Sequence, residues 1–155
     1  DLLQALELRD EFNLDMVLEH CTDAKRIAQI LKAKGAICAI GPAFVNRAKV
    51  EMENVSYDLG KALEKEGVPF SILTDHPVNP IGYLSICVGM YIRYGLDPTV
   101  ALKAVTLNAA KTLKLEDRLG SIAVGKDADL VLWTDEPFTM CAKSELVCLD
   151  GKRYK

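Results

Sequence analysis

The sequence contains only two histidines, His20 and His76, and it lacks the features that mark nucleic-acid-binding or membrane proteins. Its 19 Lys and Arg residues are scattered among 22 Asp and Glu residues, which leaves a net charge of −3 and no basic cluster. Its apolar runs are shorter than the roughly 18 to 20 residues that cross a bilayer. Residues 1–10 are amphipathic and acidic rather than signal-like. We therefore expect a cytoplasmic protein that acts on a small molecule, without nucleic acid or a membrane as partner.

The chain also lacks any CxxC pair, and its number of cysteines is odd. An odd set of thiols that lie mostly in apolar runs favours buried free cysteines over disulfides or a zinc knot. The five are Cys21, Cys38, Cys87, Cys141 and Cys148. Half of the 155 residues are hydrophobic, which is enough to build a core.

What the sequence does contain is an alternation of short apolar runs with amphipathic segments. The runs at 16–20, 36–40 and 71–74 predict strands. The periodicity and the Gly and Pro positions predict helices at 1–12, 23–34, 57–66, 80–94, 99–105 and 106–113. Strands and helices that alternate in this way predict an α/β fold with a parallel sheet and right-handed crossovers.

The last part of the chain, residues 120–155, has a different residue pattern. Turn residues separate short β-type runs, and we expect strands around Ile122 and Val124 and at 129–133, 146–149 and 152–154. Such a tail needs another sheet to pack against, because a few short strands are not stable alone.

The candidate site residues stand where predicted strands end. His20 closes the first run, and Asp75 and His76 follow the third, before Pro77. The carboxyl ends of parallel strands are where sites form in α/β proteins. For each residue a structural role is the alternative: a lone strand-end His is often only hydrogen-bonded, and Asp75 could cap the helix that follows.

Three segments carry a resemblance to a known family. The segment Gly120–Val131, GSIAVGKDADLV, resembles the GxIxxGxxADLV motif with which amidohydrolase-superfamily enzymes leave their barrel and enter a small β-sandwich. Thr106–Lys111 resembles the TxNxA segment before it, and Thr74-Asp75 resembles the acid that ends the eighth barrel strand. The likeness is greatest to the imidazolonepropionase-related branch. It implies a partial (β/α)8 TIM barrel over residues 1–119, strands six to eight with their helices, followed by β-sandwich strands over 120–155.

The resemblance also implies a metal-dependent hydrolase of carbon–nitrogen bonds other than peptide bonds. It places His20 at the end of the sixth strand, as a metal ligand or a group that contacts the substrate. It makes Asp75 a metal ligand and the proton acceptor from the attacking water, and it puts His76 near the substrate. The implied cofactor is a divalent metal, zinc first and iron as the alternative.

The same resemblance shows what this sequence does not have. The family's HxH pair on the first strand, its lysine or glutamate on the fourth and its histidine on the fifth have no counterpart in the chain. We therefore expect the C-terminal part of an amidohydrolase, with weak or no metal binding and no turnover of its own. The exposed sheet edge would then be covered by the rest of the protein or by self-association. The alternative function is a non-catalytic binding or assembly module on a degenerate amidohydrolase scaffold.

Overall fold

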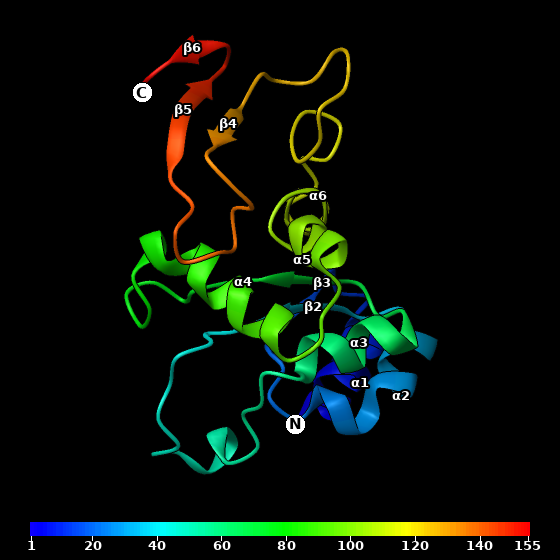
Figure 1. Cartoon of the computed structure of the whole chain (residues 1–155). Helices are drawn as coiled ribbons and strands as arrows, with labels where there is room; N and C mark the ends of the chain where they lie inside the picture. The colour runs from blue at the N-terminus through cyan, green and yellow to red at the C-terminus, as the bar shows by residue number, and fades with distance from the viewer.

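A computed structural model describes all residues, 1–155, and its first part is built on a parallel three-stranded sheet. The strands are β1 (Val17–His20), β2 (Ile37–Ile40) and β3 (Phe70–Ile72), in that spatial order (Figure 1). His20 pairs with Ile40, which in turn pairs with Ile72, so these residues form one row across the sheet. The predicted α/β character and the parallel pairing are confirmed.

Helices connect these strands, as the sequence predicts. Helix α1 (Leu2–Phe12) precedes β1, the 3-10 turn η1 (Ala24–Ile27) and helix α2 (Ala28–Ala33) lead to β2, and η2 (Val50–Met52) and α3 (Leu59–Glu66) lead to β3. The single helix expected over 23–34 is therefore two shorter pieces. Gly67 ends α3 in the left-handed region at φ 67°, and its N–H donates to the carbonyls of Leu63 and Glu64, the usual role of glycine after a helix.

A run of helices follows β3: η3 (Ile81–Tyr83), α4 (Leu84–Arg93), α5 (Pro98–Ala104) and α6 (Leu107–Thr112). Asp97 caps α5, because its carboxylate accepts hydrogen bonds from the N–H groups of Thr99 and Val100 at 2.8 and 3.1 Å. Helices α5 and α6 contact β3, and α4 packs beside α3 and α5 (Figure 1). The helices thus bury the apolar side chains that the strands project toward them.

One hydrophobic core joins the sheet to its helices. Its largest fully buried side chains are Leu6, Leu31, Ile40, Leu63, Val88 and Leu96. Gly60 allows close packing of α3, since a Cβ there would lie 3.3 Å from Leu96 and 3.4 Å from Tyr91. Cys21, Cys38 and Cys87 belong to this core as free thiols, whereas Cys141 is exposed and Cys148 is partly exposed. Burial of the cysteines is therefore confirmed for three of the five.

The tail forms a second, antiparallel sheet of β4 (Leu130–Trp133), β5 (Ser144–Leu149) and β6 (Lys152–Arg153). The strands expected at Ile122 and Val124 are absent: both side chains project from irregular chain and are 90% and 107% exposed. A strand there would need a neighbour to pair with, and none lies alongside. The loop between β4 and β5 reaches back to α4, where Phe138 packs on the core (Figure 1).

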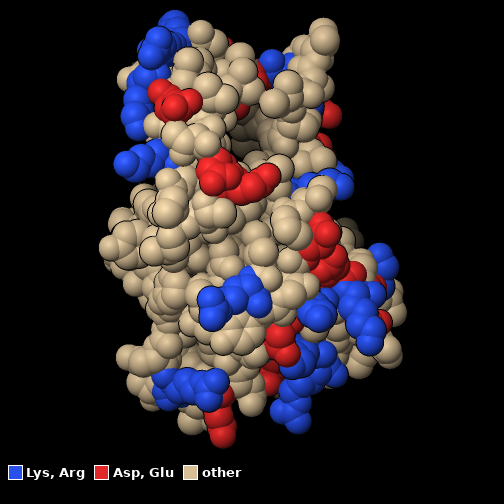
Figure 2. Space-filling model, in the orientation of Figure 1, with Lys and Arg blue, Asp and Glu red and all other residues tan.

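The outer surface of the molecule carries both charge signs. Figure 2 shows Lys and Arg side chains interspersed with Asp and Glu on the face it draws. None of the helices has the length and apolar character that would let it cross a membrane.

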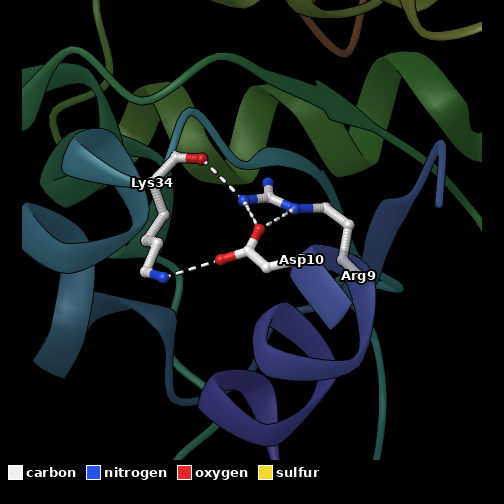
Figure 3. A network of polar contacts seen from close by, with 3 residues as sticks. All are labelled: Arg9, Asp10 and Lys34. Carbon is white, nitrogen blue, oxygen red and sulfur yellow. Dashed lines mark hydrogen bonds and ion pairs between the residues drawn. The ribbon is translucent and has the colours of Figure 1, made fainter. Parts of the chain in front are cut away.

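A polar network fastens α1 to the end of α2 (Figure 3). Asp10 accepts hydrogen bonds from Lys34 at 2.6 Å and from Arg9 at 2.7 Å, and Arg9 also donates to the Lys34 carbonyl at 2.9 Å. The Lys34 ammonium and the Arg9 guanidinium lower the pKa of the Asp10 carboxyl below its ordinary value of 3.8.

This network predicts a pH-dependent contribution to stability. A carboxyl whose pKa is lowered by folding stabilises the protein above its unfolded pKa and stops doing so as pH falls through the folded pKa. Asp10→Asn is expected to lower the free energy of unfolding at about pH 7, and this difference should shrink at an acid pH below the ordinary carboxyl pKa of 3.8. Urea unfolding of the parent and the variant at both pH values measures this difference in the free energy of unfolding. Glu11→Gln, on the same helix, is the control. A difference that stays constant with pH would contradict the role of Asp10.

Candidate functional site

The candidate site lies at the carboxyl edge of the parallel sheet. His20 is the last residue of β1, and Asp75 and His76 follow β3 by a few residues. The row His20–Ile40–Ile72 aligns the three strand ends, so the loops that follow them leave from the same edge. This common edge is the one expected from the sequence, and it is where sites form in parallel α/β folds.

The backbone turns sharply where His20 ends its strand. His20 and Cys21 both adopt positive φ, 61° and 53°, a left-handed conformation that is uncommon for residues other than glycine. The exposed imidazole places Nδ1 2.9 Å from the carbonyl oxygen of Gly41. Because a carbonyl only accepts, Nδ1 is the protonated nitrogen of this contact. In the neutral ring Nε2 then keeps a free lone pair.

Asp75 has a carboxylate without a protein partner. It is exposed, its φ is 53°, and only its backbone carbonyl is hydrogen-bonded, to the N–H of Val78 at 2.7 Å. The carboxylate makes no hydrogen bond to the next helix, so the helix-cap alternative does not apply. Residues held in strained backbone conformations are often found at functional sites, and here both His20 and Asp75 are so held.

His76 differs from His20 because its Nδ1 accepts a hydrogen bond, whereas Nδ1 of His20 donates one. Its Nδ1 lies 3.3 Å from the N–H of Ile81, from which it accepts a hydrogen bond. This contact ties the exposed imidazole to the beginning of η3. His76 therefore has a local structural partner, and its Nε2 remains open to solvent or to a ligand.

Two pockets include His20, and neither includes Asp75. The first lies under the loop between β2 and α3 and is lined by His20, Thr22, Gly41, Pro42, Val45, Met52, Val55, Ser56, Leu59 and Tyr91. The second lies on the outer side of β1, beside Glu19, Asp23 and Arg26. The loop is tied to the turn after β1 because Asn54 donates to the Asp23 carboxylate at 2.9 Å.

Close contacts and burial keep two groups around these pockets in their neutral form. The contact with Cys38, followed by burial, raises the pKa of the Cys21 thiol, and burial raises the pKa of the Tyr91 hydroxyl. Both therefore stay neutral at physiological pH. Cys21 follows His20 directly but points its thiol to the Leu18 carbonyl at 3.0 Å, away from any role as a nucleophile.

The feature that sequence reasoning missed is Asn79. Its side chain is only 5% exposed, and its amide holds the backbone of Phe44 from both sides: Oδ1 accepts from the Phe44 N–H at 3.0 Å, and Nδ2 donates to the Phe44 carbonyl at 2.7 Å. The available signal was an asparagine between Pro77 and Pro80, because asparagine side chains often bind turn backbones.

His20 and Asp75 offer the nitrogen and oxygen atoms that divalent metals bind, but they are too few to form a metal site by themselves. His20 offers Nε2 while its Nδ1 donates to a backbone carbonyl, the arrangement typical of metal-binding histidines. Asp75 offers two unpaired oxygens. No group of three or more His, Cys, Asp or Glu side chains gathers in the structure. His20 and Asp75 are therefore two side chains of the chemical kind that divalent metals bind, fewer than the three protein ligands of a typical catalytic site.

The comparisons with known proteins identify the family. The model of the Amidohydrolase family matches residues 5–152, and the chain belongs to this family. The crystal structure of an amidohydrolase from Thermotoga maritima MSB8 superposes with a TM-score of 0.95 at 38% identity, over 99% of this chain and 40% of that one. The resemblance inferred from the three sequence segments is thereby confirmed.

Two curated relatives are imidazolonepropionases. The one from Cupriavidus pinatubonensis is 33% identical over 122 residues, 77% of this chain and 27% of its own length. The one from Shewanella baltica (strain OS185) is 43% identical over 77 residues, 46% of this chain and 18% of its own length. This chain thus spans about a quarter or less of these relatives and 40% of the Thermotoga maritima chain.

Proposed function

We propose that this chain forms the C-terminal part of an amidohydrolase that hydrolyses a carbon–nitrogen bond of a small molecule, an amide or cyclic amide outside a peptide. In this proposal β1, β2 and β3 are the sixth to eighth strands of a (β/α)8 TIM barrel over residues 1–119. Residues 120–155 add strands to a small β-sandwich. The superposition on the Thermotoga maritima amidohydrolase over 99% of this chain supports this assignment.

The observation that carries the proposal is the state of the two strand-end side chains. His20 has Nδ1 occupied by the Gly41 carbonyl and Nε2 free, and Asp75 has a carboxylate without partner at the same sheet edge. A carboxylate bound in a salt bridge, or an imidazole with both nitrogens hydrogen-bonded to protein, would not be available to a ligand. A metal or a substrate can bind the lone pair on Nε2 of His20 and the carboxylate oxygens of Asp75, because no protein group occupies them.

The chemistry follows from these groups. His20 and Asp75 would help to hold a divalent metal, zinc or alternatively iron, which would lower the pKa of a water from about 15.7 toward 7. Asp75 takes the proton of the attacking water on a carboxylate oxygen and returns it to the leaving nitrogen. His20 contributes Nε2 to the metal or to the substrate carbonyl, while His76 is positioned to contact the substrate. Because two ligands do not fix a metal, we expect no turnover from these 155 residues alone.

A second candidate function is a non-catalytic binding or assembly module. The observation that favours it is the ligand count, because two metal ligands in one chain do not make a metal site. Such a module would use the open edges of the parallel sheet, at β1 and β3, to associate with another chain or with itself.

Metal analysis of the protein at its natural length distinguishes the two functions. The enzyme proposal expects about one or two zinc or iron ions per chain, as for mononuclear and binuclear catalytic sites. It also expects Zn²⁺ affinity to fall markedly in His20→Ala and Asp75→Ala. Asp117→Asn, an exposed carboxyl without a partner, is the control and should bind metal as the parent does. A folded protein that binds no metal would support the non-catalytic module instead.

A further inference from the structure

The loops that carry the candidate site are joined at one point beyond the sheet. The pairing of β2 with β3 ends at the hydrogen bond from the Leu73 N–H to the Ile40 carbonyl, 2.9 Å. Past it, the only hydrogen bonds between the loop after β2 and the loop after β3 are the two between the Asn79 side-chain amide and the backbone of Phe44. The Asn79 side chain therefore continues the hydrogen bonding between these two chain segments beyond the ends of β2 and β3.

Asn79 is itself held firmly in its own loop. Its N–H donates to the Thr74 carbonyl at 3.2 Å, next to Asp75, and its Oδ1 also receives the Cys87 thiol of α4 at 3.7 Å. The amide is buried, and both of its polar atoms are used. Because a buried amide that loses a hydrogen-bond partner is costly, this arrangement resists small displacements.

A continuous path of contacts consequently links the two proposed ligands. Asp75 directly follows Thr74, whose carbonyl accepts a hydrogen bond from the Asn79 N–H. The Asn79 side chain in turn donates to the carbonyl of Phe44. Three residues before Phe44, the Gly41 carbonyl accepts from Nδ1 of His20. Every link is a hydrogen bond or a short stretch of backbone at the carboxyl edge of the sheet.

We propose that Asn79 is a positioning residue that holds the Gly41 carbonyl against His20 and thereby sets His20 relative to Asp75. This inference rests on the proposed function for its catalytic meaning, because it concerns the two side chains assigned to the metal. Its structural content is independent. Without the hydrogen bonds of Asn79, the 41–44 segment shifts, and His20 loses the Gly41 carbonyl that favours the Nδ1–H tautomer by accepting its hydrogen bond.

Nitrogen-15 NMR of the histidine rings in the metal-free protein at its natural length tests this inference. The parent should show His20 protonated at Nδ1, with the signal assigned by its loss in His20→Gln. Asn79→Ala should move the proton of the neutral ring mainly to Nε2. The matched control is Asn108→Ala. Asn108 also uses its side-chain amide on a backbone group, because it donates to the carbonyl of Phe70 at 2.9 Å, but Phe70 lies at the beginning of β3, away from the candidate site. It should lose stability while leaving the His20 tautomer unchanged.

Zn²⁺ titration of the same proteins provides the second measurement. Removal of a group that orients a metal-binding histidine typically weakens metal affinity about 10- to 100-fold, and we expect this loss in Asn79→Ala but not in Asn108→Ala. If the parent binds no Zn²⁺, the proposed function fails, and the tautomer comparison still decides the role of Asn79.

The inference is overturned if Asn79→Ala keeps the Nδ1–H tautomer of His20, or if Asn108→Ala disturbs that tautomer equally. Should Asn79→Ala not fold, Asn79→Asp takes its place. The aspartate retains the size of the side chain and an acceptor for the Phe44 N–H, but it removes the donor to the Phe44 carbonyl. The same shift of the His20 proton is expected in this variant, and an unchanged tautomer would equally overturn the proposal.

Discussion

Replacing Asp75 by asparagine is expected to lower kcat for hydrolysis by about 10²- to 10⁴-fold, the range that a general base contributes. The amide of asparagine occupies the same volume but cannot take a proton from water. Because the Asp75 carboxylate has no partner within the chain, the substitution should leave the folded structure intact. Steady-state kinetics of the protein at its natural length on an amide or cyclic amide measure this effect, together with the thermal midpoint of unfolding.

Asp117→Asn is the matched control for this experiment. Asp117 is also an exposed aspartate without a side-chain partner, and it lies in the segment after α6, distant in sequence from the strand ends. It should retain the parent kcat. If Asp75→Asn kept full activity, Asp75 would not be the proton acceptor, and the reaction proposed for this edge of the sheet would be wrong.

Replacing Gly41 by alanine is expected to destabilise the fold by about 2–4 kcal/mol. Gly41 has φ 131°, which L side chains rarely adopt, and an added Cβ would lie 2.2 Å from the carbonyl oxygen of Leu73. Since that oxygen belongs to the backbone after β3, the clash cannot be relieved by a side-chain rotation. The strand ends must shift, and the Gly41 carbonyl that accepts from His20 is displaced with them.

Gly35→Ala separates the two causes of this effect. Gly35 also has positive φ, 61°, but nothing lies within 4 Å of a Cβ placed there. It should therefore cost only the backbone penalty of about 1–2 kcal/mol. Urea unfolding of the two variants compares them directly. Equal losses would show that the clash with the Leu73 carbonyl adds nothing to the cost of Gly41→Ala.

The local elements were predictable because their causes are local. The apolar runs before His20 and before Gly41 form strands as expected, since their β-type residues pair and bury. Gly67 and the proline at 98 mark a helix end and a helix start in the way that their backbone preferences require. The expectation failed at Ile122 and Val124, where residue type suggested strands but no neighbouring strand is present.

The common sheet edge that carries the candidate residues was predictable, whereas the hydrogen bonds between its loops were not. His20 and Asp75 were expected at the same edge because each ends or follows a strand of one parallel sheet. The hydrogen bond from His20 to Gly41 and the grip of Asn79 on Phe44 join residues that are 21 and 35 positions apart. No local pattern encodes such a pairing, because it depends on how two loops meet after the strands are aligned.

By itself, the sequence determined the order of strands and helices, the family, and the location of His20 at the end of one outer strand and of Asp75 shortly after the other. These depend on residue type and on spacing along the chain. Only the tertiary structure decided which ring nitrogen of His20 is free, which carboxylate lacks a partner and which buried amide ties the loops together. The reason is physical: a hydrogen bond is made between atoms that meet in space, and the chain brings those atoms together only when the sheet and its helices have packed.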